Sequence, residues 1–207
     1  MSKRKIKLVL SIRSLEIGGA ERQFLEIVKN IDYNEFEVLV VTSHYGTLDN
    51  EITNAQFFCL NKNSKWDLRA LWKMRNRINK FTPDVVYSFM PDMNITMSLM
   101  KLSTRKRFKL IWGQFGSDLD FSEYGLIRKK LYQIQRILEF TTDALVSDAE
   151  RGIEFLQKFN YKLSRNIVIN SGTSIERFKR NEKFRDEFRK KYSLVKGQIA
   201  IGICSRL

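Results

Sequence analysis

The residues of this chain best suited to chemistry lie at the glycine pair Gly18-Gly19 and its continuation Ala20-Glu21-Arg22. The apolar run Ile6–Ile12 precedes them, and an amphipathic helical pattern follows them. Glycine lets a backbone turn tightly and brings bare N–H groups close to a ligand. The helix that follows directs the positive end of its dipole to the same place, which favours phosphate or another oxygen-rich group. The stretch predicts a phosphate- or sugar-binding loop; a tight turn without a ligand is the alternative.

The glycine pair differs from the dinucleotide-binding fingerprint. No third glycine follows at the G-x-G-x-x-G spacing, and Glu37, the acidic residue about 20 positions on, lies inside a predicted strand. A nicotinamide-dependent dehydrogenase is therefore weakly supported. A nucleotide-binding module of another Rossmann class stays open as the weakest of the hypotheses.

His44 is the one histidine of the sequence and follows the strand-like run Phe36–Thr42. An imidazole is the natural general base near neutral pH, although a lone loop histidine is more often a surface residue. No His, Cys or carboxylate cluster has metal-ligand spacing, so we expect no metal and no cofactor. Cys59 and Cys204 lie far apart, and we interpret them as small buried hydrophobes in a reducing cytoplasm.

Polar residues able to meet a sugar acceptor follow two later predicted strands. Asp92 could contact a sugar hydroxyl or cap the apolar helix that we expect from Ile95. Asp118 and Asp120 could bind acceptor hydroxyls or cap the next helix. A hydrolase with paired carboxylates would need them across a cleft, which spacing alone cannot show.

Strand-like and helical patterns alternate along the chain. The strand-like runs are Ile6–Ile12, Phe36–Thr42, Asp84–Phe89, Lys109–Trp112, Ala144–Ser147, Ile167–Ile169 and Ile199–Ile203. Between them lie apolar helical stripes, one formed by Ile127, Leu131, Ile134 and Leu138. This alternation predicts an α/β fold with a Rossmann-like parallel sheet and helices on both faces. Ligands of such sheets bind at the carboxyl ends of the strands.

The last part of the chain, from residue 179, is not expected to belong to the Rossmann-like domain. Residues 1–178 are expected to form the Rossmann-like domain, residues 179–198 a charged connector helix, and residues 199–207 the first strand of a second, truncated domain. Arg206 ends that strand, where a guanidinium is well placed for a diphosphate unless the terminal residues are simply exposed.

The net positive charge of the chain limits the kinds of molecule that it is expected to bind. The chain has 37 basic and 23 acidic residues and a formal net charge of +14, with clusters at Lys3–Lys7, Lys101–Lys109 and Arg128–Lys130. Such a field favours a phosphosugar or the anionic inner face of a membrane, or is a merely solvated surface. No nucleic-acid-binding motif is present, so we expect no nucleic acid. No apolar run approaches the roughly 20 residues of a membrane span, and the N-terminal run is too short for a signal peptide.

Five segments, in order, resemble the N-terminal half of a family-4 glycosyltransferase of the GT-B fold. They are Leu15–Arg22 (resembling L-x-x-G-G-A-E), Pro83–Tyr87 (P-D-V-V-x), Asp143–Glu150 (D-x-I-V-x-N-S-E), Val168–Phe178 (I-P-N-G-I-D-x-x-x-F) and Ile201–Leu207 (I-G-x-V-G-R-L). The chain departs from these patterns at several positions. Those positions are Asp148, Ala149, Ser171, Ser174, Ser205 and Gln114, the last near where many relatives carry a histidine.

The resemblance implies metal-independent, retaining transfer of a hexose from a nucleotide-sugar, as in polysaccharide biosynthesis. The basic surface favours a cell-surface glycan or a lipid-linked molecule as the acceptor. The resemblance implies donor-phosphate contacts from Gly18, Gly19 and Arg206. Acceptor contacts are expected from Glu21, Asp92, Gln114 and Asp118. The resemblance assigns no catalytic residue. The expectation is an acceptor-side domain that is inactive alone, cytoplasmic and peripheral at the inner membrane face. The alternative is a non-catalytic or partner-dependent subunit whose donor domain is a separate chain.

Overall fold

The computed structural model describes residues 4–62, 67–104, 107–116, 121–162, 164–173, 175–176 and 178–203, without the side chains of 121–126. Several positions singled out above lie outside these residues, namely Asp118, Asp120, Ser174, Cys204, Ser205 and Arg206. Contacts divide the chain into two units, Met1–Ser171 and Gly172–Leu207, and each is described by itself.

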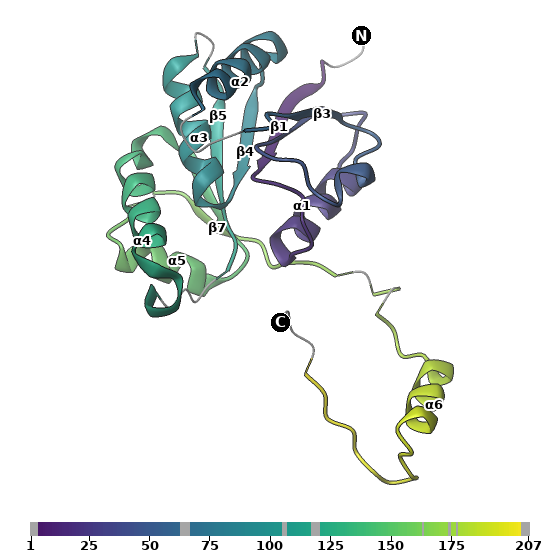
Figure 1. Cartoon of the computed structure of the whole chain (residues 1–207). Helices are drawn as coiled ribbons and strands as arrows, with labels where there is room; N and C mark the ends of the chain where they lie inside the picture. The colour runs from purple at the N-terminus through teal and green to yellow at the C-terminus, as the bar shows by residue number, and fades with distance from the viewer. Residues whose placement is uncertain are drawn as a thin grey trace. The chain divides into compact units, whose positions relative to one another are not determined.

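A seven-stranded parallel sheet of order β3-β2-β1-β4-β5-β6-β7 forms the centre of the first unit (Figure 1). Its strands are β1 (Ile6–Ile12), β2 (Phe36–Thr42), β3 (Gln56–Cys59), β4 (Val85–Phe89), β5 (Lys109–Gln114), β6 (Ala144–Ser147) and β7 (Asn166–Val168). β1 pairs with β2 on one side and with β4 on the other, so the strand order reverses direction there. The predicted Rossmann-like α/β sheet is confirmed, and its topological switch point lies between β1 and β4.

Helices cover both faces of the sheet. They are α1 (Gly19–Asn30), α2 (Leu68–Phe81), α3 (Met90–Ser103), α4 (Phe121–Ile137) and α5 (Glu150–Lys158), with short 3₁₀ turns η1 (Asp49–Glu51) and η2 (Glu139–Thr141). Phe24 and Val28 of α1 pack on one face of the sheet. Met74 of α2, Met97 of α3 and Tyr132 of α4 belong to the core of the other face (Figure 1).

Element boundaries follow the sequence most closely where both faces of a strand are buried. β1, β2 and β6 have the predicted bounds. The edge strand β3 was not predicted, because its apolar residues Phe57, Phe58 and Cys59 form only a short, half-buried run. Helix α3 begins at Met90 and not at Ile95, and Pro91 fits the first turn because its missing N–H has no intrahelical partner there.

The predicted apolar face of α4 is only partly correct: Leu138 packs against the core and Leu131 is half-buried. The apolar stripe placed Ile127 and Ile134 against the core, but these side chains are 68% and 46% exposed. The helix instead buries Tyr132 and Gln135. The Tyr132 ring meets Phe155 edge-on with centroids 5.1 Å apart, and its hydroxyl contacts Gln114 Nε2 at 3.2 Å.

The described residues of the second unit contain one helix, α6 (Glu182–Lys191), within the residue range predicted for the connector. Asn181 caps it by accepting a hydrogen bond from Phe184 N at 3.1 Å. The described residues 199–203 form no strand, contrary to the sequence-based expectation, and Ile199, Ile201 and Ile203 are exposed. A strand requires a neighbour for its N–H and C=O groups, and none pairs with these residues in the described ranges.

Candidate functional site

Four loops at the carboxyl ends of the strands surround an opening of about 420 Å³. It is lined by Gly19, Ala20 and Gln23 of α1, Phe115 and Gly116 after β5, Asp148 after β6, and Ser171 after β7. Open parallel sheets bind ligands at this edge, so the opening is the candidate functional site.

The glycine pair shapes the site differently from the tight turn that we expected. Gly18 caps α1 with φ −163° and ψ 169°, an extended backbone that any residue can adopt. A Cβ placed on Gly19 would meet no atom within 4 Å. Backbone strain therefore does not require glycine at position 18, and packing does not require it at position 19. The missing side chains leave the first N–H groups of α1, which no side chain caps, accessible to an anion.

The loop that carries the glycine pair is held by the loop after β2. Leu48 N donates a hydrogen bond to Leu15 O at 2.9 Å. A Cβ on Gly46 would lie within 2.5 Å of the Leu15 backbone, a distance that no side chain tolerates. Close backbone packing therefore fixes the approach to α1.

Phe115 provides an aromatic surface at the opening. Its ring stacks on Phe89 with centroids 4.7 Å apart and planes 10° apart. Phe89 in turn meets Phe24 edge-on at 4.9 Å and Tyr87 at 4.5 Å. A ring held by such contacts keeps a fixed orientation, and its half-buried face suits stacking with a sugar or base.

Asp148 brings an unsatisfied carboxylate oxygen to the opening. Its Oδ1 is buried and accepts no hydrogen bond from any described residue. Burial, and then the Asp148 charge, raise the pKa of Tyr87. Because an unpaired buried oxygen costs about 1–3 kcal/mol, a hydroxyl donated by a ligand would be favoured beside Asp148.

A second group of polar residues lies at the ends of β1, β2 and β3. Ser43 N and His44 N both donate to Arg13 O, at 2.9 and 3.0 Å, and Lys62 N donates to Ser43 O at 3.1 Å. Arg13 Nε lies 3.8 Å from Asp92 Oδ2 at the start of α3. The backbone hydrogen bonds bring Arg13, His44 and Lys62 together, and the ion pair adds the Asp92 carboxylate.

The charges of this group perturb one another. Burial raises the pKa of Asp92, opposed by Arg13 and by the Met93 N–H. Burial, Arg13 and Lys62 lower the pKa of His44, and Asp92 raises it less. At neutral pH, His44 is therefore an uncharged proton acceptor among groups with a net positive charge.

The predicted acceptor residues occupy different environments. Glu21 is half-buried in the first turn of α1. Asp92 Oδ1 accepts a hydrogen bond from Met93 N at 3.1 Å. Gln114 is fully buried, and its Nε2 donates to Gly116 O and contacts Tyr132 Oη, both at 3.2 Å. Gln114 thus supports the loop after β5 and does not line the opening.

Phe115 and Asp148 were not selected from the sequence as site residues. The one signal that could have indicated Asp148 is its departure from the family pattern at an asparagine position. Phe115 gave no signal, because only the fold shows that its ring reaches the edge of the sheet. The predicted residues Asp118 and Arg206 lie outside the described part of the chain.

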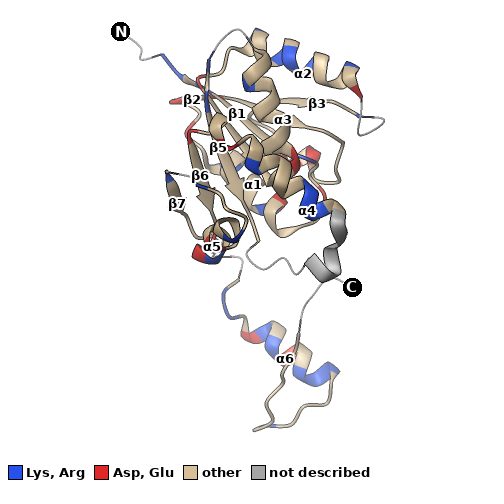
Figure 2. Ribbon diagram, turned by 90° about the vertical axis from the view of Figure 1, so that its left-hand side faces the viewer, with Lys and Arg blue, Asp and Glu red and all other residues tan. Residues whose placement is uncertain are grey.

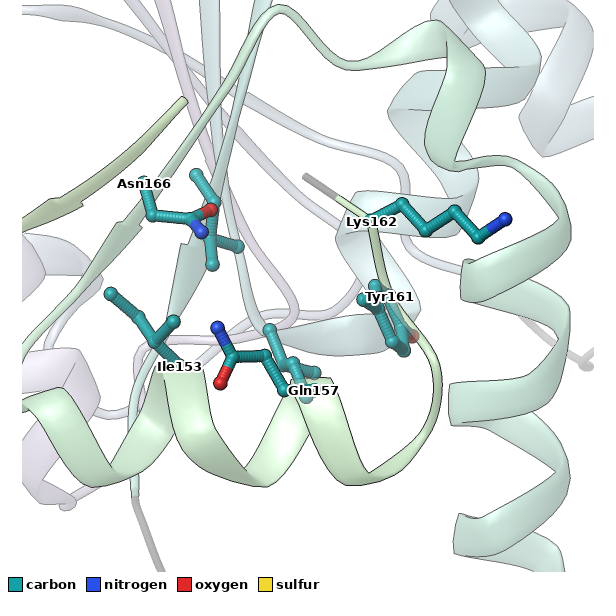
Figure 3. Close-up of a pocket in the computed structure, with 7 residues that line it drawn as sticks. Ile153, Gln157, Tyr161, Lys162 and Asn166 are labelled. Atoms are coloured by element: carbon teal, nitrogen blue, oxygen red, sulfur yellow. The ribbon is translucent and has the colours of Figure 1, made fainter. Parts of the chain in front are cut away.

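A smaller pocket of about 210 Å³ lies under α5, away from this edge (Figure 3). Ile153 and Gln157 extend from α5 toward Asn166 at the start of β7, while the Lys162 side chain points away. Asn166 pairs with Leu145 near the beginning of β6, so the pocket is not at the carboxyl ends. Among the described residues, no group of three or more His, Cys, Asp or Glu is arranged to hold a metal ion.

Comparison with known proteins assigns the family. Residues 17–180 match the family model of Glycosyltransferase Family 4. The chain belongs to this family. The match includes the glycine pair, Phe115 and Asp148, so the candidate site lies within the family's own domain. A search of curated proteins found no match.

Solved glycosyltransferase structures have the same fold. HepE of Anabaena in complex with UDP superposes with a TM-score of 0.70 at 16% identity, over 91% of this chain and 50% of that one. Sucrose-phosphate synthase of Thermosynechococcus elongatus gives 0.67 at 10% identity, over 89% and 53%. The lipopolysaccharide outer core galactosyltransferase WaaB gives 0.60 at 12% identity, over 82% and 46%. The chain therefore spans about half the length of the structures that it matches.

Proposed function

We propose that this chain forms one wall of a cleft in which a glycosyltransferase moves a sugar from a nucleotide-sugar to an acceptor. The observation that carries the proposal is the accessible N-terminus of α1 at Gly18-Gly19, beside Phe115 and Asp148. A phosphate suits the helix N-terminus, a ring suits the Phe115 face, and hydroxyls suit the Asp148 oxygen. HepE, with the same fold, was solved with UDP and with UDP-glucose, which supports a nucleotide-sugar donor.

The acceptor half of the proposal rests on the Arg13, His44, Lys62 and Asp92 group. Its excess positive charge suits an acceptor that carries phosphate or carboxylate groups, such as a lipid-linked or cell-surface glycan. Within this group, His44 and Asp92 are the side chains that could take a proton from an acceptor hydroxyl. The same proposal includes that the transferred sugar retains its anomeric configuration, and that the reaction takes place in the cytoplasm at the inner face of a membrane.

The donor contacts can be tested with UDP as the probe. Gly19→Asp places a carboxylate where the phosphate is proposed to bind, and we expect UDP affinity to fall about tenfold or more. The open space around Gly19 admits the side chain, and an acidic residue in the first turn stabilises a helix. Gly19→Ala is the matched control and should keep affinity within about twofold. Equal UDP affinity of Gly19→Asp and the parent chain would contradict the proposal.

Catalysis is proposed to require donor-binding residues in addition to this wall. We therefore expect no sugar transfer from UDP-glucose by the 207-residue chain alone, measured as UDP release with and without acceptor. Turnover by the chain alone would show that the site described here is complete.

A further inference from the structure

The outer surface of α3, α4 and η2 exposes apolar side chains that the sheet does not bury. Ile137 and Phe140 are 72% and 74% exposed, and Ile134 is 46% exposed. Leu99 and Leu102 of α3 are exposed as well. Helix α3 packs against both α4 and η2, so these side chains belong to one helical layer (Figure 1). We call these five side chains the outer apolar patch.

Basic side chains flank the outer apolar patch. Lys129, Lys130 and Arg136 of α4 are exposed, and the sequence from Ile127 to Ile137 contains no Asp or Glu. Helix α2, the next helix of the layer, likewise carries Lys and Arg but no acidic residue. Figure 2 shows the Lys and Arg segments along α2 and α4.

The cluster Lys101–Lys109, predicted from the sequence to meet a membrane, is partly neutralised. Lys101 and Lys109 both form ion pairs with Asp143. Residues 105 and 106 lie outside the described ranges. The exposed Lys129 and Lys130 therefore carry the argument, because they lie on the same helix as the exposed Ile134 and Ile137.

We propose that the outer apolar patch docks on a phospholipid bilayer that contains anionic lipids. Ile137 and Phe140 insert among the headgroups, while Lys129 and Lys130 meet the lipid phosphates. Large apolar side chains flanked by basic residues are what an interfacial helix presents to a membrane, and each basic residue near the surface adds attraction to anionic lipid. Docking would give the site access to a lipid-linked acceptor, and this part of the inference rests on the proposed function. The docking itself needs no sugar nucleotide.

Helix α6 provides the contrast within the same chain. It also exposes Phe184 and Phe188. Its basic residues alternate with Glu182, Asp186 and Glu187, so its surface lacks the one-signed charge that anionic lipid favours. We therefore expect α6 to contribute little to membrane binding.

Co-sedimentation with vesicles tests the proposal. The full chain should bind vesicles of phosphatidylcholine mixed with phosphatidylglycerol, with much weaker binding to phosphatidylcholine alone and at high salt. Ile137→Ser with Phe140→Ser should lower the partition coefficient roughly tenfold or more. Lys129→Gln with Lys130→Gln should lower it roughly tenfold without removing apolar contacts.

Phe184→Ser with Phe188→Ser in α6 is the matched control and should leave binding unchanged. The proposal fails if the chain does not bind anionic vesicles, if the Ile137/Phe140 and Lys129/Lys130 variants both bind as the parent does, or if the α6 variant alone loses binding. The UDP affinity of the Ile137/Phe140 and Lys129/Lys130 variants, measured without lipid, should equal that of the parent chain. This second readout separates a failure of membrane docking from a failure of the proposed function.

Discussion

At the scale of single residues, the site depends on backbone N–H groups and a carboxylate oxygen whose hydrogen-bonding capacity is not fully used. The first N–H groups of α1 have no side-chain cap, and Asp148 Oδ1 has no donor among the described residues. Buried polar groups are nearly always paired, so incomplete pairing at the edge of a sheet favours a ligand there. Gly18 and Gly19 contribute by carrying no side chain, since their backbone conformation is ordinary.

The lone histidine provides a direct test of the electrostatics near Asp92. Because burial, Arg13 and Lys62 lower its pKa, His44 should titrate below the usual value of about 6.5. Asp92→Asn should lower the pKa further, and Arg13→Gln should raise it. Proton NMR of the His44 ring follows this titration without ambiguity, since the sequence has no other histidine. A pKa at or above 6.5 in the parent chain would contradict the arrangement of Arg13, Lys62 and Asp92.

At the scale of elements, side chains far from the site join the strands and helices that position it. Asp143 accepts hydrogen bonds from Lys101 Nζ of α3 and from Lys109 Nζ and Leu110 N of β5. Partial burial would raise its pKa, but these donors outweigh burial and lower the pKa to about 2. Asp143 thus ties the starts of β5 and β6 to the end of α3.

This depressed pKa predicts a pH dependence of stability. A carboxyl whose folded pKa lies below its unfolded value stabilises the fold above about pH 4, and the stabilisation is lost as pH falls toward 2. Asp143→Asn should therefore cost on the order of 1–2 kcal/mol at pH 7 and much less near pH 2. Urea unfolding at the two pH values measures the difference. An equal cost at both would show that the ion pairs do not set the pKa.

Helix α5 approaches β6 so closely that one position excludes a side chain. A Cβ on Gly152 would lie 2.3 Å from Ser147 Oγ. Gly152→Ala should destabilise the fold by about 1–3 kcal/mol through overpacking. Ser147→Ala removes the clashing oxygen, so the double variant should recover much of the loss, as measured by thermal unfolding. Strictly additive costs would contradict this packing.

The elements also show what the sequence could predict. Buried strands such as β1 and β6 are continuous apolar runs, so their bounds could be predicted directly. The buried face of α4 could not, because Tyr132 is held by Gln114, a partner distant in sequence. Gly18 and Gly19 were recognisable as a motif, whereas Phe115 and Asp148 come together with them only through the strand order.

At the scale of the whole molecule, the first unit provides a seven-stranded sheet, and the chain spans about half the length of the glycosyltransferase structures that share its fold. No helix of the described chain is long and apolar enough to cross a membrane.

Amide NMR mapping of UDP on the isotope-labelled chain tests the central claim most directly. We predict weak, saturable binding at millimolar UDP, with the largest shifts at Gly18, Gly19 and Ala20 and at Phe115 and Gly116. The same titration of Gly19→Asp should show these shifts reduced or absent. Shifts confined to the pocket under α5, or no shift at these concentrations, would contradict the claim that the start of α1 and Phe115 form a donor-binding wall.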